Sequence, residues 1–217
     1  MHKPRPDHHT KRGFRNPPGS PVRQHQRRAY WRFIWRRILF ARRAAVMPEG
    51  HVLERAETLA GLADHAGAGC LTWLGHASFL IHTAGKTVLF DPYLGDFASP
   101  VRGVGPKRFA PPALTSRQLP PIDVLIVSHN HYDHLCADTI RHLPHKDRIN
   151  VVVPLGLGRF FRRRGYSRVH ELDWHGSVIV EGITVTALPA VHWSKRTPFD
   201  RNRTLWASFA VASAQHR

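Results

Sequence analysis

The sequence predicts a layered α/β domain preceded by a basic N-terminal region. Two observations predict this fold class. From Cys70 onward, short apolar runs of strand length alternate with turn residues and with segments of helical character, an order typical of sheets covered by helices. The chain has 217 residues, of which 42% are hydrophobic, enough for one domain with a sizeable core. We therefore expect a single α/β domain over residues 67–217.

The N-terminal region differs from the rest of the chain in composition and charge. Residues 1–26 are rich in proline, arginine, histidine and glycine, which is typical of a disordered arm. The first fifty residues hold thirteen lysines and arginines against Asp7 and Glu49, so most of the net charge of +17 lies there. Such an excess indicates an anionic partner, either a lipid surface or a nucleic acid.

Residues 27–66 form a second region with helical character. Over 27–46, RRAYWRFIWRRILFARRAAV, apolar residues such as Tyr30 and Ile34 recur at helical spacing, and arginines fill much of the remaining surface. This pattern predicts a basic amphipathic helix that lies on an anionic membrane, although a helix packed on its own domain would show the same pattern. We expect no nucleic-acid partner. A second helix is predicted over 51–65.

The domain is predicted to begin as a meander of short strands. A loop rich in proline and glycine, residues 95–121, then crosses to a buried strand. The predicted strands are 70–74, 77–83, 86–90, 122–128, 150–153, 177–180, 182–188 and 205–212, and the predicted helices lie near 136–143 and 157–164.

Cysteine content and hydropathy bear on the compartment. Cys70 and Cys136 form neither a disulfide framework nor a cysteine-type zinc motif, which favours a reducing environment. No run of 18 apolar residues predicts a transmembrane helix, and the polar N-terminus does not resemble a signal peptide. We expect a cytoplasmic protein, with peripheral attachment to the inner face of a membrane as an option.

The stretch VSHNHYDHL, residues 127–135, places metal-ligand side chains at the end of the predicted buried strand. His129 and His131 are two residues apart on an extended segment, so both rings can point to the same side and bind one tetrahedral zinc ion. Asp133 and His134 follow as the chain turns and can face a second ion. Imidazole and carboxylate ligands suit zinc, with iron or manganese as competitors.

A zinc ion held by two histidines needs a third protein ligand. His192 is the best candidate, because it also follows an apolar strand run. His76, at another strand turn, is interpreted as a residue that supports the site rather than a ligand. Lys195 and Arg196, beside His192, are candidates for steering a phosphate group, and solvated loop charges are the equal alternative.

The chain resembles the metallo-β-lactamase superfamily and, within it, the N-acyl-phosphatidylethanolamine-hydrolysing phospholipase D family. The pattern His-x-His-x-Asp-His marks the superfamily, whereas GPKRF, HNHYDHL and HWSKRT together indicate the branch. The matching stretches are FRNP (14–17), TWLGHASFLI (72–81), DPYL (91–94), SPVRGVGPKRF (99–109), LPPIDVLIVSHNHYDHL (119–135), VPLGL (153–157), ELDW (171–174) and PAVHWSKRTPFDRNRTLWASFAV (189–211).

The resemblance implies an αββα sandwich with a dinuclear zinc site at the strand ends. It implies that His129, His131 and His192 hold one zinc, and that Asp133 and His134 contribute to the other. Asp133 would also orient the attacking water. The implied substrate is a membrane phospholipid, N-acyl-phosphatidylethanolamine, which the family cleaves to an N-acylethanolamine and phosphatidate.

Two ligands of the family pattern are missing from this sequence. Neither the metal-bridging aspartate of a Gly-Asp-Thr-Gly-type segment nor the late histidine is found, and the chain ends in ASAQHR. We therefore expect roughly the N-terminal half of the fold, at most about one zinc, and little activity from this chain alone. The alternatives are another hydrolase of the same fold, such as a lactonase or nuclease-like enzyme, and a truncated non-catalytic product with residual zinc or membrane binding.

Overall fold

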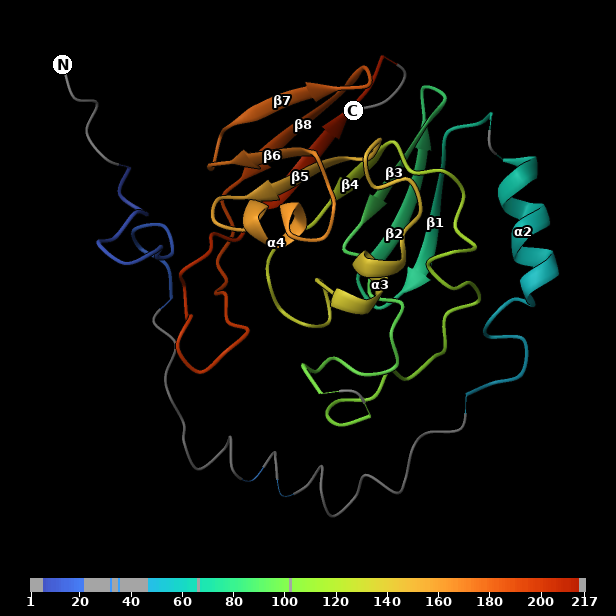
Figure 1. Cartoon of the computed structure of the whole chain (residues 1–217), viewed down its shortest axis with the longest axis horizontal. Coiled ribbons are helices and arrows are strands. Elements are labelled where there is room, and N and C mark those ends of the chain that lie inside the picture. Colours follow the sequence, from blue (N-terminus) through green and yellow to red (C-terminus); the bar gives the residue numbers. More distant parts are fainter. Residues whose placement is uncertain are drawn as a thin grey trace.

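A computed structural model describes residues 6–21, 32, 35, 47–65, 67–101 and 103–214. The described residues form two sheets and three short helices (Figure 1). The elements are α2 (Arg55–Asp64), β1 (Cys70–Gly75), β2 (Ser78–Thr83), β3 (Lys86–Phe90), β4 (Val124–Ile126), α3 (Ala137–His142), β5 (Asn150–Pro154), α4 (Gly158–Arg162), β6 (Arg168–Leu172), β7 (Ser177–Val180), β8 (Ile183–Leu188) and β9 (Ser208–Ala212).

The larger sheet has six strands in the order β1-β2-β3-β4-β5-β6. Strands β1, β2 and β3 form an antiparallel meander, and β3 to β6 pair in parallel. Parallel neighbours need a crossover connection, and the chain uses α3 between β4 and β5 and α4 between β5 and β6. The carboxyl ends of β4 and β5 therefore lie at one edge of the sheet, where ligands bind in open α/β folds.

The central strands are buried on both faces, which explains their continuous hydrophobic runs. One face packs against the helices, and its core contains Leu89, Leu125 and Val151 together with Ile140 of α3 and Phe161 of α4. Alternate residues face the smaller sheet. That second core contains Val88, Val124, Ile126, Val152, Val180, Ile183 and Val185.

The smaller sheet is antiparallel, with the order β7-β8-β9. Its inward residues on β8 are fully buried, whereas Thr184 and Thr186 on the opposite face are partly exposed. Within the described part of the chain, the layers are thus helix, sheet and sheet, and no described helix covers the outer face of β7–β9. The predicted mixed α/β architecture is confirmed.

From residue 51 onward, the predicted strands and helices match the observed elements with one omission, β6. Its sequence, RVHEL, has two apolar residues and therefore no apolar run. The strand forms because it pairs in parallel with β5 along five residues, and because Glu171 accepts hydrogen bonds from the Gly156 amide and from Arg162. These contacts are tertiary and leave no local signal in the sequence.

Within the N-terminal region, the structure describes residues 6–21, which contact the domain. The Phe14 amide donates to Asn202 O at 2.8 Å, and Gly13 approaches this carbonyl so closely that a Cβ would lie 2.0 Å from it. These contacts place the described part of the N-terminal region beside the loop that contains Asn202.

The predicted amphipathic helix, residues 27–46, lies outside the described residues apart from Arg32 and Trp35. Both of these are helical and exposed. Among the helices that the structure describes, none is long and apolar enough to cross a bilayer.

Candidate metal centre

Three histidines converge at the edge of the larger sheet where β4 ends. Strand β4 leads into the loop that carries His129 and His131, and the loop after β8 carries His192. The Ala207 amide, just before β9, donates to Ser128 O at 3.0 Å, which ties these two regions together. The sequence placed all three histidines at strand ends, and the structure brings those ends together.

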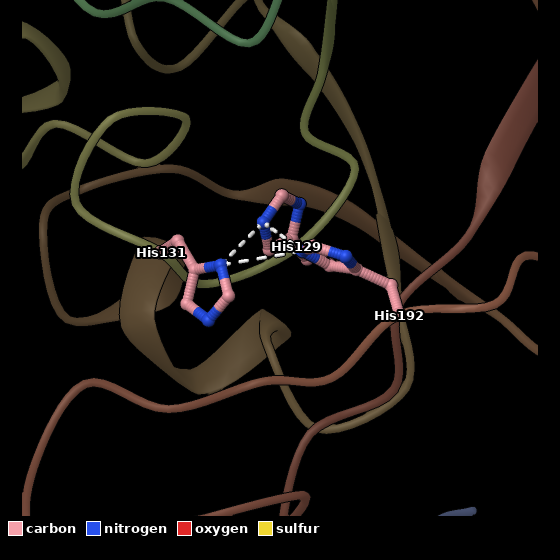
Figure 2. Close-up of side chains that lie close together, drawn as sticks. All are labelled: His129, His131 and His192. Carbon is pink, nitrogen blue, oxygen red and sulfur yellow. Dashed lines mark hydrogen bonds between the residues drawn. The ribbon is translucent and has the colours of Figure 1, made fainter. Parts of the chain in front are cut away.

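The ring nitrogens of these histidines face one another closely (Figure 2). His129 Nε2 lies 2.8 Å from His131 Nδ1 and 3.0 Å from His192 Nε2, and the last two atoms are 3.3 Å apart. Donor atoms on one tetrahedral zinc are separated by about 3.3 Å, given Zn–N bonds of about 2.0–2.1 Å. The three nitrogens therefore have the spacing of ligands to a single ion.

Burial keeps two of these histidines uncharged at neutral pH. Burial, reinforced by the neighbouring histidines, lowers the pKa of His129 to about 2. Burial and the proximity of His192 lower the pKa of His131 to about 4. A neutral imidazole has a lone pair on one ring nitrogen, which is the form that binds metals.

Asp91 determines which nitrogen of His129 carries that lone pair. This buried carboxylate accepts hydrogen bonds from the Ser128 amide at 2.6 Å and from Ser128 Oγ at 2.5 Å. Because the hydroxyl proton points at Asp91, Ser128 Oγ accepts from His129 Nδ1–H, 2.9 Å away. His129 Nε2 is then unprotonated and faces His131 and His192. Carboxylates behind ligand histidines orient metal sites in this way.

Asp91 also orients His134, whose Nδ1–H donates to Asp91 Oδ2 at 2.8 Å. Burial lowers the pKa of His134, but the hydrogen bond to Asp91 and its charge outweigh burial, so the net shift is upward. The sequence interpretation missed Asp91, although DPYL was among the stretches shared with the related family. The available signal was an acidic residue directly after a strand run.

A second group of potential ligands consists of His76, Asp133 and His134, whose ligand atoms lie within 4.8 Å of one another. His76 Nε2 is 3.0 Å from Asp133 Oδ2, and His134 Nε2 is 3.9 Å from the same oxygen. The sequence predicted that His76 supports the site without binding metal. In the structure, His76 Nε2 lies close enough to Asp133 and His134 to be a third potential metal ligand of this group.

Two residues of the site adopt left-handed backbone conformations. His76 has φ of 53° and Asp91 has φ of 42°. Non-glycine residues rarely adopt this region, although aspartate and histidine do so more readily than most. In both cases the chain has just left a strand and turns toward the two histidine groups.

Arg196 and Lys195 lie on the loop that carries His192, but they are placed differently. Arg196 Nη1 donates to the carbonyls of Asn130 and Leu135 at 2.9 and 2.7 Å, and its guanidinium lies 4.0 Å from the Tyr132 ring. These contacts fasten the His192 loop to the loop of His129–His134. Lys195 is exposed and is therefore the freer of the two to meet an anionic group.

A cleft of about 640 Å³ opens beside both histidine groups. His76, His131 and Asp133 lie in its wall together with five aromatic residues and Lys107. Tyr93 Oη is buried with no hydrogen-bond partner among the described residues. The aromatic residues are Trp73, Tyr93, Phe109, Tyr132 and Trp193. The cleft thus combines apolar walls with cationic and metal-ligand side chains.

Comparison with known proteins assigns the family. The family model for the beta-lactamase superfamily domain matches residues 86–217. This range includes most of the site. The chain belongs to the metallo-β-lactamase superfamily. The neutral imidazoles and the spacing of their nitrogens fit the metal dependence of this superfamily's hydrolases.

Two curated relatives are much longer than the part that this chain matches. An uncharacterised protein of Mycobacterium tuberculosis is 42% identical over 149 residues, which is 68% of this chain and 40% of that protein. The N-acyl-phosphatidylethanolamine-hydrolyzing phospholipase D 1 of Caenorhabditis elegans is 38% identical over 156 residues, which is 67% of this chain and 44% of that enzyme. The chain therefore spans less than half the length of these curated relatives.

One solved structure is similar to part of the chain. A protein of Veillonella parvula, described as a possible metal-dependent hydrolase, matches with a TM-score of 0.45 and 21% identity. The match covers 54% of this chain and 46% of that one.

Proposed function

We propose that the chain supplies the metal-binding part of a zinc-dependent phosphodiesterase that cleaves N-acyl-phosphatidylethanolamine to an N-acylethanolamine and phosphatidate. The observation that carries this proposal is the cleft, where aromatic walls and Lys107 meet His76, His131 and Asp133. A phospholipid has the matching parts, which are apolar chains and an anionic phosphodiester. The 38% identity to a phospholipase D of this specificity supports the same substrate.

The chain's own residues have distinct parts in this reaction. His129, His131 and His192 would hold one zinc, and His134 with Asp133 and His76 would contribute to a second position. Bound zinc supplies Lewis acidity, which makes water a nucleophile at neutral pH and stabilises charge on the phosphoryl oxygens. Asp133 would orient the attacking water and accept its proton. Lys195 and Lys107, both exposed, would draw the phosphate toward the cleft.

The substrate class is tested with a fusion of this chain to the C-terminal half of the C. elegans relative. We expect this fusion, loaded with zinc, to release phosphatidate from N-acyl-phosphatidylethanolamine, with release abolished by a chelator and by His131→Ala. The unfused chain should be nearly inactive, because its second metal position has few donors. The matched control is His65→Ala, which should retain activity. His65 is an exposed histidine directly after α2.

Three substrates distinguish the proposal from its alternatives. The fusion is offered the phospholipid, an acyl-homoserine lactone and a short RNA under the same conditions. Hydrolysis of the lactone or the RNA, with the phospholipid left intact, would replace the substrate assignment and retain the hydrolase. Rapid cleavage of the phospholipid by the unfused chain would contradict the account of its second metal position.

We also propose that residues 27–46 bring the enzyme to anionic lipid. Aromatic and basic side chains on one helix bind membrane surfaces through apolar burial and through attraction to anionic headgroups. A peptide of this segment should bind phosphatidylserine vesicles at low salt and be released at about 1 M salt, where the Debye length is about 3 Å. A peptide that stays unbound at low salt would favour the alternative of a helix packed on its own domain.

A further inference from the structure

A third cluster of potential ligands lies apart from the two histidine groups and joins the N-terminal segment to Asp173, the residue after β6. His8 Nε2 is 2.5 Å from Asp173 Oδ1, and His9 Nε2 is 2.7 Å from Asp173 Oδ2. The ligand atoms of all three residues lie within 4.8 Å of one another. The contributing segments are separated by more than 160 positions in the sequence.

Local structure fixes both imidazoles in place. A bridge between His9 and Phe14 closes a tight hairpin, in which the Thr10 amide donates to Gly13 O at 2.8 Å. The His8 ring stacks on Trp174 with centroids 4.1 Å apart, and the His9 ring meets Phe14 edge-on at 5.1 Å. Successive side chains on an extended strand would point to opposite sides. The turn at His8 instead directs both rings to one carboxylate.

Burial and ligand chemistry resemble those of a metal site. The side chains of His8, His9 and Asp173 are 10%, 16% and 30% exposed, so the cluster is mostly shielded yet open to water on one side. The Trp174 amide donates to Asp173 Oδ1 at 2.8 Å and holds the carboxylate in position. Two imidazoles, a carboxylate and a water molecule form a ligand set that zinc accepts.

We propose that His8, His9 and Asp173 bind a zinc-class divalent ion, and that this ion fastens the N-terminal segment to the domain. Ligand atoms around a tetrahedral zinc are separated by about 3.3 Å, so movements of less than about 1 Å convert the observed contacts into coordination. This site is independent of the proposed substrate. With this site, the chain would bind one ion more than the sequence predicts.

The fastened segment also contacts the metal centre, because Asn16 Oδ1 accepts a hydrogen bond from the His192 amide at 2.9 Å. The Phe14 amide binds Asn202 O on the same loop. An ion at His8, His9 and Asp173 would therefore stabilise the loop that carries His192. Its role is structural, since the cluster does not line the cleft beside the other histidines.

The test measures zinc binding by equilibrium dialysis against zinc ions alone, followed by elemental analysis. The background is the full chain with His129→Ala and His131→Ala, which removes the first centre. We expect this background to retain about one zinc per chain, and Asp173→Asn and His9→Gln each to weaken that binding at least tenfold. His65→Ala should leave it unchanged.

The His9→Gln variant separates the metal site from a clasp made of hydrogen bonds. A glutamine amide can still donate to Asp173, so the segment should stay folded against the domain while zinc binding is lost. The same variant in the otherwise unaltered chain should lose one equivalent of zinc, which covers the case in which the background variant does not fold. A folded background that binds no zinc would overturn the proposal. So would zinc binding by the unaltered chain that neither Asp173→Asn nor His9→Gln weakens.

Discussion

His131→Ala is expected to lower zinc affinity at the first centre by about 100-fold or more. Substituting residues that merely support a ligand costs about 10- to 100-fold in metal affinity, so removing a ligand should cost at least as much. Of the three described ligands in this group, the substitution leaves His129 and His192, whose Nε2 atoms are 3.0 Å apart. Competition with a chromophoric chelator measures the affinity directly.

The matched control for this experiment is His65→Ala, because the chain is rich in histidine and surface histidines bind zinc weakly. His65 is exposed, and its ring contacts the Gly61 carbonyl of its own helix. The His65→Ala variant should bind zinc as the unaltered protein does. An equal loss in both variants would indicate scattered surface binding and would contradict a centre at His129, His131 and His192.

Asp91→Asn is expected to weaken zinc binding by about 10- to 100-fold and to destabilise the domain by about 1–3 kcal/mol. The carboxylate of Asp91 accepts from the Ser128 amide, from Ser128 Oγ and from His134 Nδ1. An amide has only one acceptor oxygen, so at least one buried donor loses its partner. A carboxylate then no longer determines which ring nitrogen of His129 and of His134 carries the proton.

Asp138→Asn provides the comparison for Asp91→Asn. Asp138 is an aspartate near the start of α3 whose side chain is 70% exposed. Its substitution should change neither zinc affinity nor the midpoint of urea unfolding measurably. If Asp91→Asn behaved like Asp138→Asn in both measurements, the network through Ser128 would have no part in the site.

Much of the fold could be predicted from the sequence, because strands buried on both faces leave continuous apolar runs. The runs at β3, β4 and β5 fixed the centre of the larger sheet, and His192 was found because it follows such a run. Strand β6 was missed because its pairing depends on β5 and on the Glu171 contacts. These interactions are set by packing and leave no periodic pattern.

The parts of the site that sequence reasoning missed depend on contacts between distant segments. Asp91 lies 37 positions before Ser128, and Asp173 lies 165 positions after His8. Spacing within a motif predicts neighbours such as His129 and His131, but it does not pair residues across the chain. The backbone strain at His76 and Asp91 is likewise visible only in three dimensions.

Diffraction at the zinc absorption edge, from crystals of the protein grown with zinc, tests the central claim most directly. We predict an anomalous peak about 2.0–2.1 Å from His129 Nε2, His131 Nδ1 and His192 Nε2. Peaks confined to other positions, with these three nitrogens still at hydrogen-bond distance from one another, would contradict a metal centre at the end of β4.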